Sequence, residues 1–271
     1  MTALKTRTEL SKEFKNVKYI LTSSMRTRIL LAIYNDSKNL DDLRRDLNKP
    51  SATILHGLKE LETENLVRKV QKYYELTSNG YLLTTNMIKL IENWYAINKN
   101  KSFWDNHDIS DIPQELIKNI YLLKNARYVS STTSDLSNAF NKYKKLISRA
   151  SHLKIILPIY SEIHFKLLIK LLKGKQLKSL ELIISQRILN SIKRNNYFNK
   201  GLIKNNKVKI TIIKRNMKVF LTCSDQFMSL SLFFKDKHYD DSQILIANDD
   251  KALDWASTLF NQFMEENKND K

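Results

Sequence analysis

Apolar residues in the first part of the chain recur at the three- and four-residue spacing of amphipathic helices, and then in runs of strand length. The helical spacing predicts helices at residues 14–21, 24–34, 40–47 and 51–66. Two β-branched or aromatic runs follow at 66–70 and 73–76, with only Gln71 and Lys72 between them. The pattern therefore predicts a helical cluster followed by a β-hairpin.

Short polar residues mark where these helices begin. The pair Ser23-Ser24 is expected to cap the second helix, because a serine hydroxyl accepts a hydrogen bond from a backbone N–H of the first turn. Asp41 and Asp42 fall in the first turn of the third helix, where the helix dipole favours negative charge. Pro50 disfavours helical geometry at Lys49, so Ser51 is expected to cap the fourth helix.

The helix at 51–66 has one apolar and one polar face. The apolar stripe is Ile54, Leu58 and Leu61, and the polar face carries Ser51, Thr53, His56 and Lys59. A helix that follows a tight turn and precedes a hairpin is typical of a winged helix-turn-helix domain, in which that helix enters the major groove. We expect the polar face to read double-stranded DNA. The hairpin cations Arg68, Lys69 and Lys72 are expected to contact phosphates.

A long amphipathic helix is expected from Gly80 to Ile97. Its apolar positions are Leu82, Leu83, Met87, Leu90, Ile91 and Trp94. Such a helix dimerises, links to a second domain or packs on its own domain, and the pattern leaves these possibilities open. Because two-fold dimers contact two half-sites, we expect a homodimer that uses this helix and possibly the C-terminal domain.

The C-terminal half alternates strands with helices. Strands are expected at 154–158, 180–185, 208–214, 219–224 and 227–234, and helices near 134–150, 161–173 and 186–200. This predicts an α/β domain with a central mixed sheet, in a chain that is α+β overall. The expected domains are 1–85 (winged helix-turn-helix), 86–118 (linker helix and connector) and 119–266 (regulatory domain), followed by a frayed tail at 267–271.

The chain is strongly basic, with 46 Lys and Arg against 28 Asp and Glu and a net charge of +18. Basic chains associate with polyanions such as nucleic acid. Residues 1–99 carry a net charge of +6 and residues 100–271 a net charge of +12, so total charge does not say which half meets DNA. Cys223 is the single cysteine, and the sequence has neither a signal pattern nor a long apolar run, so we expect a cytoplasmic protein without membrane association.

Candidate catalytic groups do not assemble in the sequence. His164-Phe165-Lys166 matches the start of the His-x-Lys-x4-Asp pattern of phospholipase-D-like enzymes, but Leu171 stands where the Asp is needed. This segment instead predicts a helix that buries Ile163, Leu167 and Leu171. His107-Asp108 is either a base with its orienter or a structural pair, with Asp108 capping the turn before Pro113. The five histidines lack metal-ligand spacing, so we expect no catalysis, no metal and no cofactor.

Two sets of sequence motifs resemble known families. The run SATILHGLKELETENLV followed by YYELTSNG resembles ArsR/MarR-type winged-helix proteins. Trp104, His107, Asp108, Ile112 and Pro113, together with the closing segment 237–263, resemble the archaeal Fil-type methanogenesis regulators, although His238 stands where that family usually has Gly. This second resemblance implies a regulatory domain related to non-catalytic phospholipase-D-like folds.

Residues at or just past the expected strand ends are candidates for binding a small effector. Ligands of open α/β sheets tend to bind beyond the carboxyl ends of strands. The candidates are Pro158, Tyr160, Ser185, Arg187, Lys214 and Arg215. Their cationic and hydrogen-bonding groups suggest that the effector is a small anion. The sequence thus favours a DNA-binding transcription regulator with an effector-sensing domain. The alternatives are a DNA-tethered phosphodiesterase-like hydrolase and an architectural protein whose C-terminal half only oligomerises.

Overall fold

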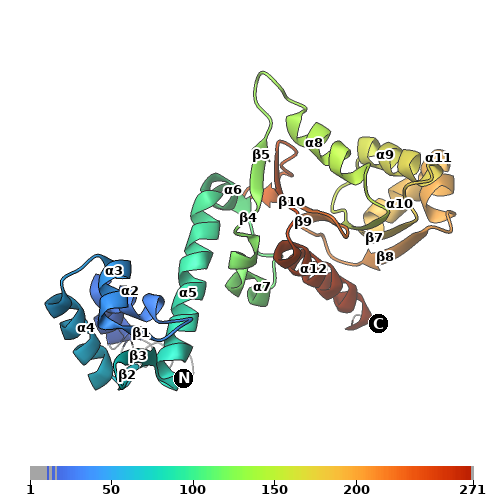
Figure 1. Ribbon diagram of the computed structural model, residues 1–271. Coiled ribbons are helices and arrows are strands. Elements are labelled where there is room, and N and C mark those ends of the chain that lie inside the picture. Colours follow the sequence, from blue (N-terminus) through green and yellow to red (C-terminus); the bar gives the residue numbers. More distant parts are fainter. Residues whose placement is uncertain (1–10, 12–13, 16, 270–271) are drawn as a thin grey trace. The chain divides into compact units, whose positions relative to one another are not determined.

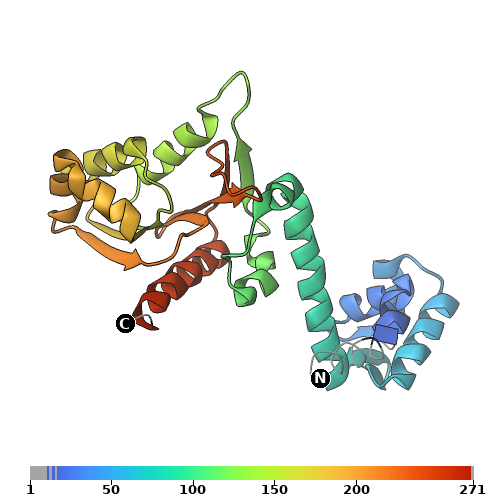
Figure 2. The ribbon, with the colours of Figure 1, turned by 180° about the vertical axis from the view of Figure 1, so that it is seen from behind.

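The computed structural model describes residues 11, 14–15 and 17–269, which form two compact units, Met1–Ile91 and Glu92–Lys271. The boundary falls inside the long helix α5 (Ser78–Lys99). The connector expected over 86–118 is therefore divided between the two units. Figures 1 and 2 show the chain from opposite sides.

The first unit combines short helices with a three-stranded antiparallel sheet. Helical backbone at 17–21 is followed by α2 (Ser24–Ala32), β1 (Lys38–Asn39), α3 (Leu40–Leu47), α4 (Ser51–Thr63), β2 (Val67–Val70) and β3 (Tyr73–Leu76). The sheet order is β1-β3-β2, and the expected two-residue turn joins β2 to β3. This is the element order of a winged helix-turn-helix domain. The strand β1 was not predicted, since two residues are too few to display alternation.

The ends of these helices agree only in part with the sequence. The Ser23 hydroxyl caps α2 by accepting a hydrogen bond from the Arg26 N–H, as expected. The prediction that Ser51 caps α4 is wrong, because Pro50 holds the cap position without a side-chain hydrogen bond. The helix α4 ends at Thr63 rather than at 66, and Asn65 then takes a left-handed conformation (φ 53°) that no helix can continue through.

The core of the first unit fixes which face of α4 meets solvent. Ile54, Leu58 and Leu61 are buried with the apolar residues of α2 and α3, as the spacing predicts. Of the apolar residues expected to hold the first helix, Ile20 is buried, whereas Phe14 is 62% exposed.

The second unit is built on one mixed sheet. Its strands are β4 (His107–Asp108), β5 (Arg127–Ser130), β6 (His152–Ile156), β7 (Ser179–Ser185), β8 (Val208–Ile213), β9 (Val219–Cys223), β10 (Met228–Phe234) and β11 (Gln243–Ala247). The order is β5-β11-β10-β9-β6-β7-β8, with β4 paired to β10. Neighbours β6, β7 and β8 are parallel and the other pairs are antiparallel, which confirms the mixed α/β sheet.

Helices cover both faces of this sheet (Figure 2). They are α6 (Lys101–Asn106), α7 (Gln114–Lys118), the 3₁₀ turn η1 (Ile120–Leu123), α8 (Asn138–Ile147), α9 (Glu162–Lys173), α10 (Gln186–Arg194), α11 (Asn196–Phe198), the π-turn η2 (Asn199–Ile203) and α12 (Asp250–Asn269). Alternate strand residues point to opposite faces. On β7, for example, Ile183 joins the core that includes α12, whereas Leu182 and Ile184 join the core with α8, α9 and α10.

Two expected boundaries in this unit need correction. The helix expected at 186–200 breaks after Arg194, because Asn195 leaves helical geometry and caps α11 with its side chain. The tail expected to fray from 267 onward continues α12 to Asn269, and residues 270–271 lie outside the described residues.

Candidate nucleic-acid interface and small-molecule pocket

The helix α4 presents most of the expected polar residues to solvent. Thr53, His56 and Lys59 are exposed, and Ser51 is half-buried in the first turn. The His56 side chain is 77% exposed, with its Nε2 3.8 Å from Glu60 Oε1. Because the opposite face of α4 is fully buried, these side chains have a fixed outward direction that suits contact with base edges in a groove.

A mostly buried ion pair, which sequence reasoning missed, holds α4 against α2. Arg26 is 8% exposed, and its Nη1 lies 2.7 Å from Glu60 Oε2. The Tyr19 hydroxyl donates to Glu60 Oε1 at 3.0 Å, and the Arg26 guanidinium lies 3.8 Å from the centre of the Tyr19 ring. The hydrogen bond from Arg26 lowers the pKa of Glu60 below its usual value. The signal was present in the sequence, since Arg26 begins an i, i+3, i+4, i+7 stripe that Ile29, Leu30 and Ile33 complete.

The three cations of the hairpin differ in their partners and in the face of the hairpin on which they lie. Arg68 pairs across the strands with Glu75, with Nη2 2.6 Å from Oε1. Lys69 lies opposite Tyr74, on the other face of the hairpin, with its ammonium 5.4 Å from that ring. Lys72 lies in the turn. All three are exposed, but Arg68 is paired with a carboxylate, whereas Lys69 and Lys72 form no ion pair with a carboxylate of the described residues.

The second unit contains a pocket of about 380 Å³ between α8, α9 and the strands β9 to β11. Five rings form a contiguous wall with centroid separations of 5.1 to 6.5 Å: Phe140, Tyr143, His164, Phe220 and Tyr239. Sites for small molecules occupy about 300–1,000 Å³ and are mostly apolar with a few placed polar groups. The size and the lining both match this description.

Polar groups of the pocket lie among these rings. The Nδ1 of His164 lies 2.8 Å from the Ser161 hydroxyl, and burial lowers the pKa of His164 to about 4, so its ring is neutral near pH 7. Burial raises the pKa of Tyr143 and Tyr239, so both hydroxyls keep their protons. Gln243 also lines the pocket, and its buried Oε1 has no hydrogen-bond partner among the described residues. A buried acceptor without a donor is a place for a ligand donor or a water.

The residues predicted to bind an effector are not brought together. Tyr160 lines the pocket, whereas Arg187 and Lys214 are exposed and, within the described part of the chain, neither lines it. Ser185 caps α10 by accepting from the Ile188 N–H.

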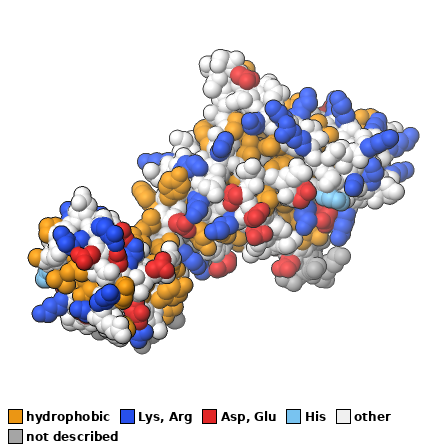
Figure 3. Space-filling view, in the orientation of Figure 1, with side chains coloured by type: hydrophobic (Ala, Val, Ile, Leu, Met, Phe, Trp, Pro, Cys, Tyr) orange, Lys and Arg blue, Asp and Glu red, His pale blue; other side chains and the backbone are white. Residues whose placement is uncertain are grey.

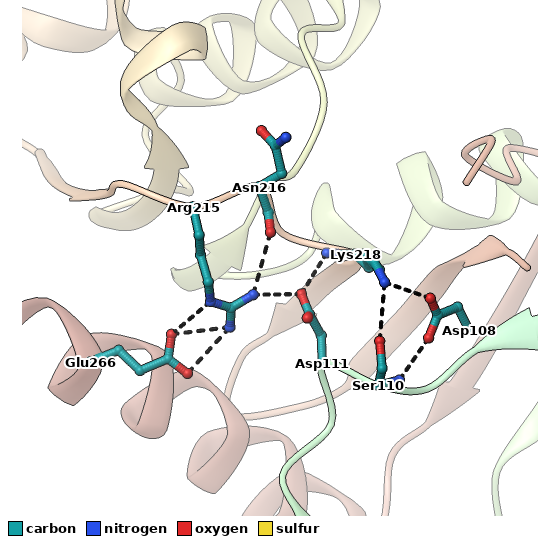
Figure 4. A network of polar contacts seen from close by, with 7 residues as sticks. All are labelled: Asp108, Ser110, Asp111, Arg215, Asn216, Lys218 and Glu266. Carbon is teal, nitrogen blue, oxygen red and sulfur yellow. Dashed lines mark hydrogen bonds and ion pairs between the residues drawn. The ribbon is translucent and has the colours of Figure 1, made fainter. Parts of the chain in front are cut away.

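Arg215, another of the predicted effector-binding residues, is part of a polar network (Figure 4). Its Nη1 lies 2.8 Å from Asp111 Oδ2, and its Nη2 lies 3.0 Å from Glu266 Oε2. Nearby, Lys218 Nζ lies 2.6 Å from Asp108 Oδ2, and this contact lowers the pKa of Asp108 to about 2. The network ties the segment after β8 to the segment after β4 and to α12, so the Arg215 charge is engaged by the protein itself.

His107 and Asp108, which are adjacent in sequence, have separate partners. His107 Nε2 lies 2.9 Å from Asp240 Oδ2, and both side chains are almost fully buried. Asp108 accepts from the Ser110 N–H at 2.8 Å, which is the turn role that the sequence suggested. Since Asp240 follows Tyr239 of the pocket wall, the His107–Asp240 contact links the pocket to β4 within this unit.

The environment of His164 differs from the prediction. Ile163 is 54% exposed, so the expectation that Ile163 is buried is wrong, and Leu171 is only half-buried. Leu167 is buried as predicted, and the other buried residues of α9 are Phe165, Leu168, Ile169 and Leu172. Lys166 is exposed and pairs with Glu162 instead of joining His164. Cys223 is buried as expected, and burial raises the pKa of its thiol to about 12.

The described residues contain neither a cluster of three metal-ligating side chains nor a helix long and apolar enough to cross a bilayer.

Comparisons with solved structures give only distant likenesses. TrmBL2, an archaeal chromatin protein, is 13% identical, with 89% of this chain and 90% of that chain covered and a TM-score of 0.40. The dimethyltransferase RosA from Streptomyces davawensis is 10% identical, with 78% and 67% covered and a TM-score of 0.27. Yeast tyrosyl-DNA phosphodiesterase is 10% identical, with 45% and 31% covered and a TM-score of 0.25. Scores this low carry no argument about function.

Sequence comparison is more informative. A curated relative, methanogenesis regulatory protein FilR1 from Methanothrix harundinacea (strain 6Ac), is 24% identical over 260 residues, which cover 94% of this chain. The chain spans 58% of the length of that relative. Two family models match as well: the N-terminal domain of methanogenesis regulatory protein FilR1 over residues 14–94, and its middle domain over residues 136–266. With both domains matched in order, the chain belongs to the FilR1 family of methanogenesis regulatory proteins.

Proposed function

We propose that this protein is a DNA-binding transcription regulator that reads the major groove with α4 and contacts flanking phosphates with the β2–β3 hairpin. The observation that carries the proposal is the polar, outward face of α4, oriented by a buried stripe and by the Arg26–Glu60 pair. Membership of a regulatory family supports it.

The test is sequence preference. A preferred duplex is first selected from a random library with the full chain. Each base-edge contact is worth about 1–3 kcal/mol of discrimination, so Thr53→Ala and His56→Ala should narrow the affinity gap between selected and random duplex by roughly tenfold each. Thr63→Ala, at the other end of α4, is the matched control. Unchanged preference in both variants would remove α4 as the reader.

The second unit is proposed to sense a small molecule in its pocket. The sequence pointed to an anion, but the described pocket lining contains no Lys or Arg and includes the carboxylate of Asp241. Burying an unpaired anion there would be costly. The aromatic wall, the two tyrosine hydroxyls and the neutral His164 instead favour an uncharged ligand with an apolar or aromatic body and hydrogen-bonding groups.

Coupling to DNA binding would begin at the β10–β11 loop. Tyr239 contributes to the pocket wall, and its neighbour Asp240 holds His107 at the end of α6. A ligand that favours one position of this loop would bias α6, and effector coupling of this kind is typically worth about 1–3 kcal/mol.

Three small probes test the ligand class: para-cresol (neutral), para-toluate (anionic) and para-methylbenzylammonium (cationic). The neutral probe should raise the melting temperature of the full chain most. Ser229→Leu, which fills the pocket from β10, and Ile163→Trp, which obstructs it from an exposed position, should abolish the shift, whereas Ile117→Trp on α7 should not. If no probe raises the melting temperature, the alternative in which the C-terminal half only oligomerises becomes the better description of this unit.

A hydrolytic function is disfavoured by the surroundings of His164. The Ser161–His164 contact resembles half of a nucleophile–base pair, but such a base needs a third group to orient it. Among the described residues, no carboxylate contacts the other ring nitrogen of His164. We therefore propose a non-catalytic protein.

A further inference from the structure

The positive charge of the chain is concentrated in one stretch of the second unit. Residues 163–218 hold 15 of the 46 Lys and Arg residues but only one of the 28 Asp and Glu residues, Glu181. This segment therefore supplies a net +14 of the total +18. A general bias of the composition toward lysine would not remove acidic residues, whereas this segment is almost free of them.

The fold gathers many of these cations at the end of the unit where α9, α10, α11 and η2 meet. Lys207 Nζ donates to the carbonyls of Leu172 and Leu177, which joins the loop before β8 to the end of α9. Lys173 and Lys200 border the same hollow of about 280 Å³, and the Lys173 ammonium lies 5.1 Å from the centre of the Tyr197 ring. Figure 3 shows Lys and Arg gathered over this end, whereas cations and carboxylates are mixed over the first unit.

We call this surface the basic end and define it by Lys170, Lys173, Lys175, Arg194, Lys200 and Lys204. All six are exposed, and none forms an ion pair with a carboxylate of the described residues. The two acidic residues nearest in sequence are engaged elsewhere, Glu162 with Lys166 and Glu181 with Lys209. Like charges held together without counter-charges repel one another. A bound polyanion relieves this repulsion, and the electrostatic free energy that is released favours binding.

We infer that the basic end is a second, sequence-independent contact for the phosphate backbone of duplex DNA. The inference rests on the proposed function, because a duplex held by the first unit is kept at high local concentration near the second. Lysine ammonium groups act as point charges on flexible stems, which suits phosphates rather than base edges. Contacts of this kind add affinity and salt dependence without adding sequence preference.

The experiment measures affinity for a long random-sequence duplex against salt concentration, with the full chain. The basic-end variant replaces Lys170, Lys173, Lys200 and Lys204 with Gln. The matched control replaces Lys101, Lys235, Lys237 and Lys251, which are exposed elsewhere on the same unit, so both variants lose the same charge. With about 0.9 counterion released per phosphate contact, the basic-end variant should lose about 3–4 from the slope of log affinity against log salt. At low salt it should bind roughly 100-fold more weakly than the control.

A third variant, Lys69→Gln with Lys72→Gln, separates this inference from the proposed function. If the hairpin variant weakens binding and the basic-end variant matches its control, the basic end does not bind DNA and the inference is wrong. If the basic-end variant alone weakens binding, the inference stands, and the phosphate contacts proposed for the hairpin are the part of the proposed function that fails. Binding that is lost only toward single-stranded DNA or phosphatidylserine vesicles, and not toward duplex, would also overturn it.

Discussion

At the scale of single residues, burial decides what His164 can do. Its ring is enclosed by Phe140, Tyr143 and Phe220, and burial lowers the pKa of His164 to about 4. An unperturbed histidine has a pKa of about 6.5. The protein therefore keeps a neutral imidazole in an aromatic pocket across the physiological range, where it can exchange hydrogen bonds without carrying charge.

This difference predicts a pH dependence of stability. Between about pH 4 and pH 6.5 the unfolded chain binds a proton at His164 that the folded chain does not, so the free energy of unfolding falls as the pH is lowered through this window. From about pH 7 to about pH 5 we expect His164 alone to cost the second unit about 1–2 kcal/mol. Denaturant unfolding at both pH values measures this.

The control for that experiment is His164→Phe, which keeps an aromatic ring and removes the titrating group. Subtracting the variant from the wild type isolates His164 from the carboxylates that titrate nearby. Equal losses of stability on acidification in both proteins would show that His164 does not titrate as its burial requires.

At the scale of elements, the start of α5 depends on one glycine. A Cβ placed on Gly80 would lie 1.9 Å from the backbone oxygen of Leu66, which already accepts the Thr77 N–H. Because backbone cannot move aside as a side chain can, Gly80→Ala should destabilise the first unit by about 3 kcal/mol or more. Asn79→Ala, one exposed residue earlier, should change little. Denaturant unfolding of the two variants makes the comparison, and equal stabilities would contradict it.

The hairpin offers a second prediction at this scale, because its cations differ in their partners. Lys69→Gln with Lys72→Gln should reduce the salt slope of duplex binding by about two, since each cation releases about one counterion. Arg68→Gln should reduce it by less than one, because Glu75 already pairs with that guanidinium. A larger loss for Arg68 than for the lysines would mean that Glu75 releases Arg68 to DNA.

At the scale of the whole molecule, α5 keeps large apolar side chains in solvent. Leu82, Leu90 and Trp94 are 63%, 59% and 65% exposed. We propose that a second copy of the chain covers part of this helix, because a two-fold dimer contacts two half-sites. Sedimentation should then give twice the 31.9 kDa of one chain. Leu90→Lys with Trp94→Lys should give the monomer mass, whereas Ile109→Lys should not. A monomeric wild type at micromolar concentration, with and without DNA, would exclude the dimer.

Local patterns were sufficient for much of the architecture. The stripe Ile54, Leu58 and Leu61, the two-residue turn at Gln71 and Lys72, and the apolar runs of the parallel strands follow from spacing alone, because each buried face repeats with the period of its own element. The sequence by itself thus determined the winged-helix order and the mixed α/β sheet. It also determined the exposed face of α4, because the buried stripe leaves the other side to solvent.

Other features were decided only by tertiary structure, because they join residues that are far apart in the chain. The sequence suggested a partner for His107 beside it, but the fold supplies Asp240, 133 residues away. The position of Arg215 in the sequence suggested an effector contact, but the fold pairs its guanidinium with Asp111 and Glu266. The pocket likewise needs α8, α9 and three strands at once. Periodicity reports which face of an element is buried, but it carries no information about which other element lies against that face, and side-chain partners depend on that second fact.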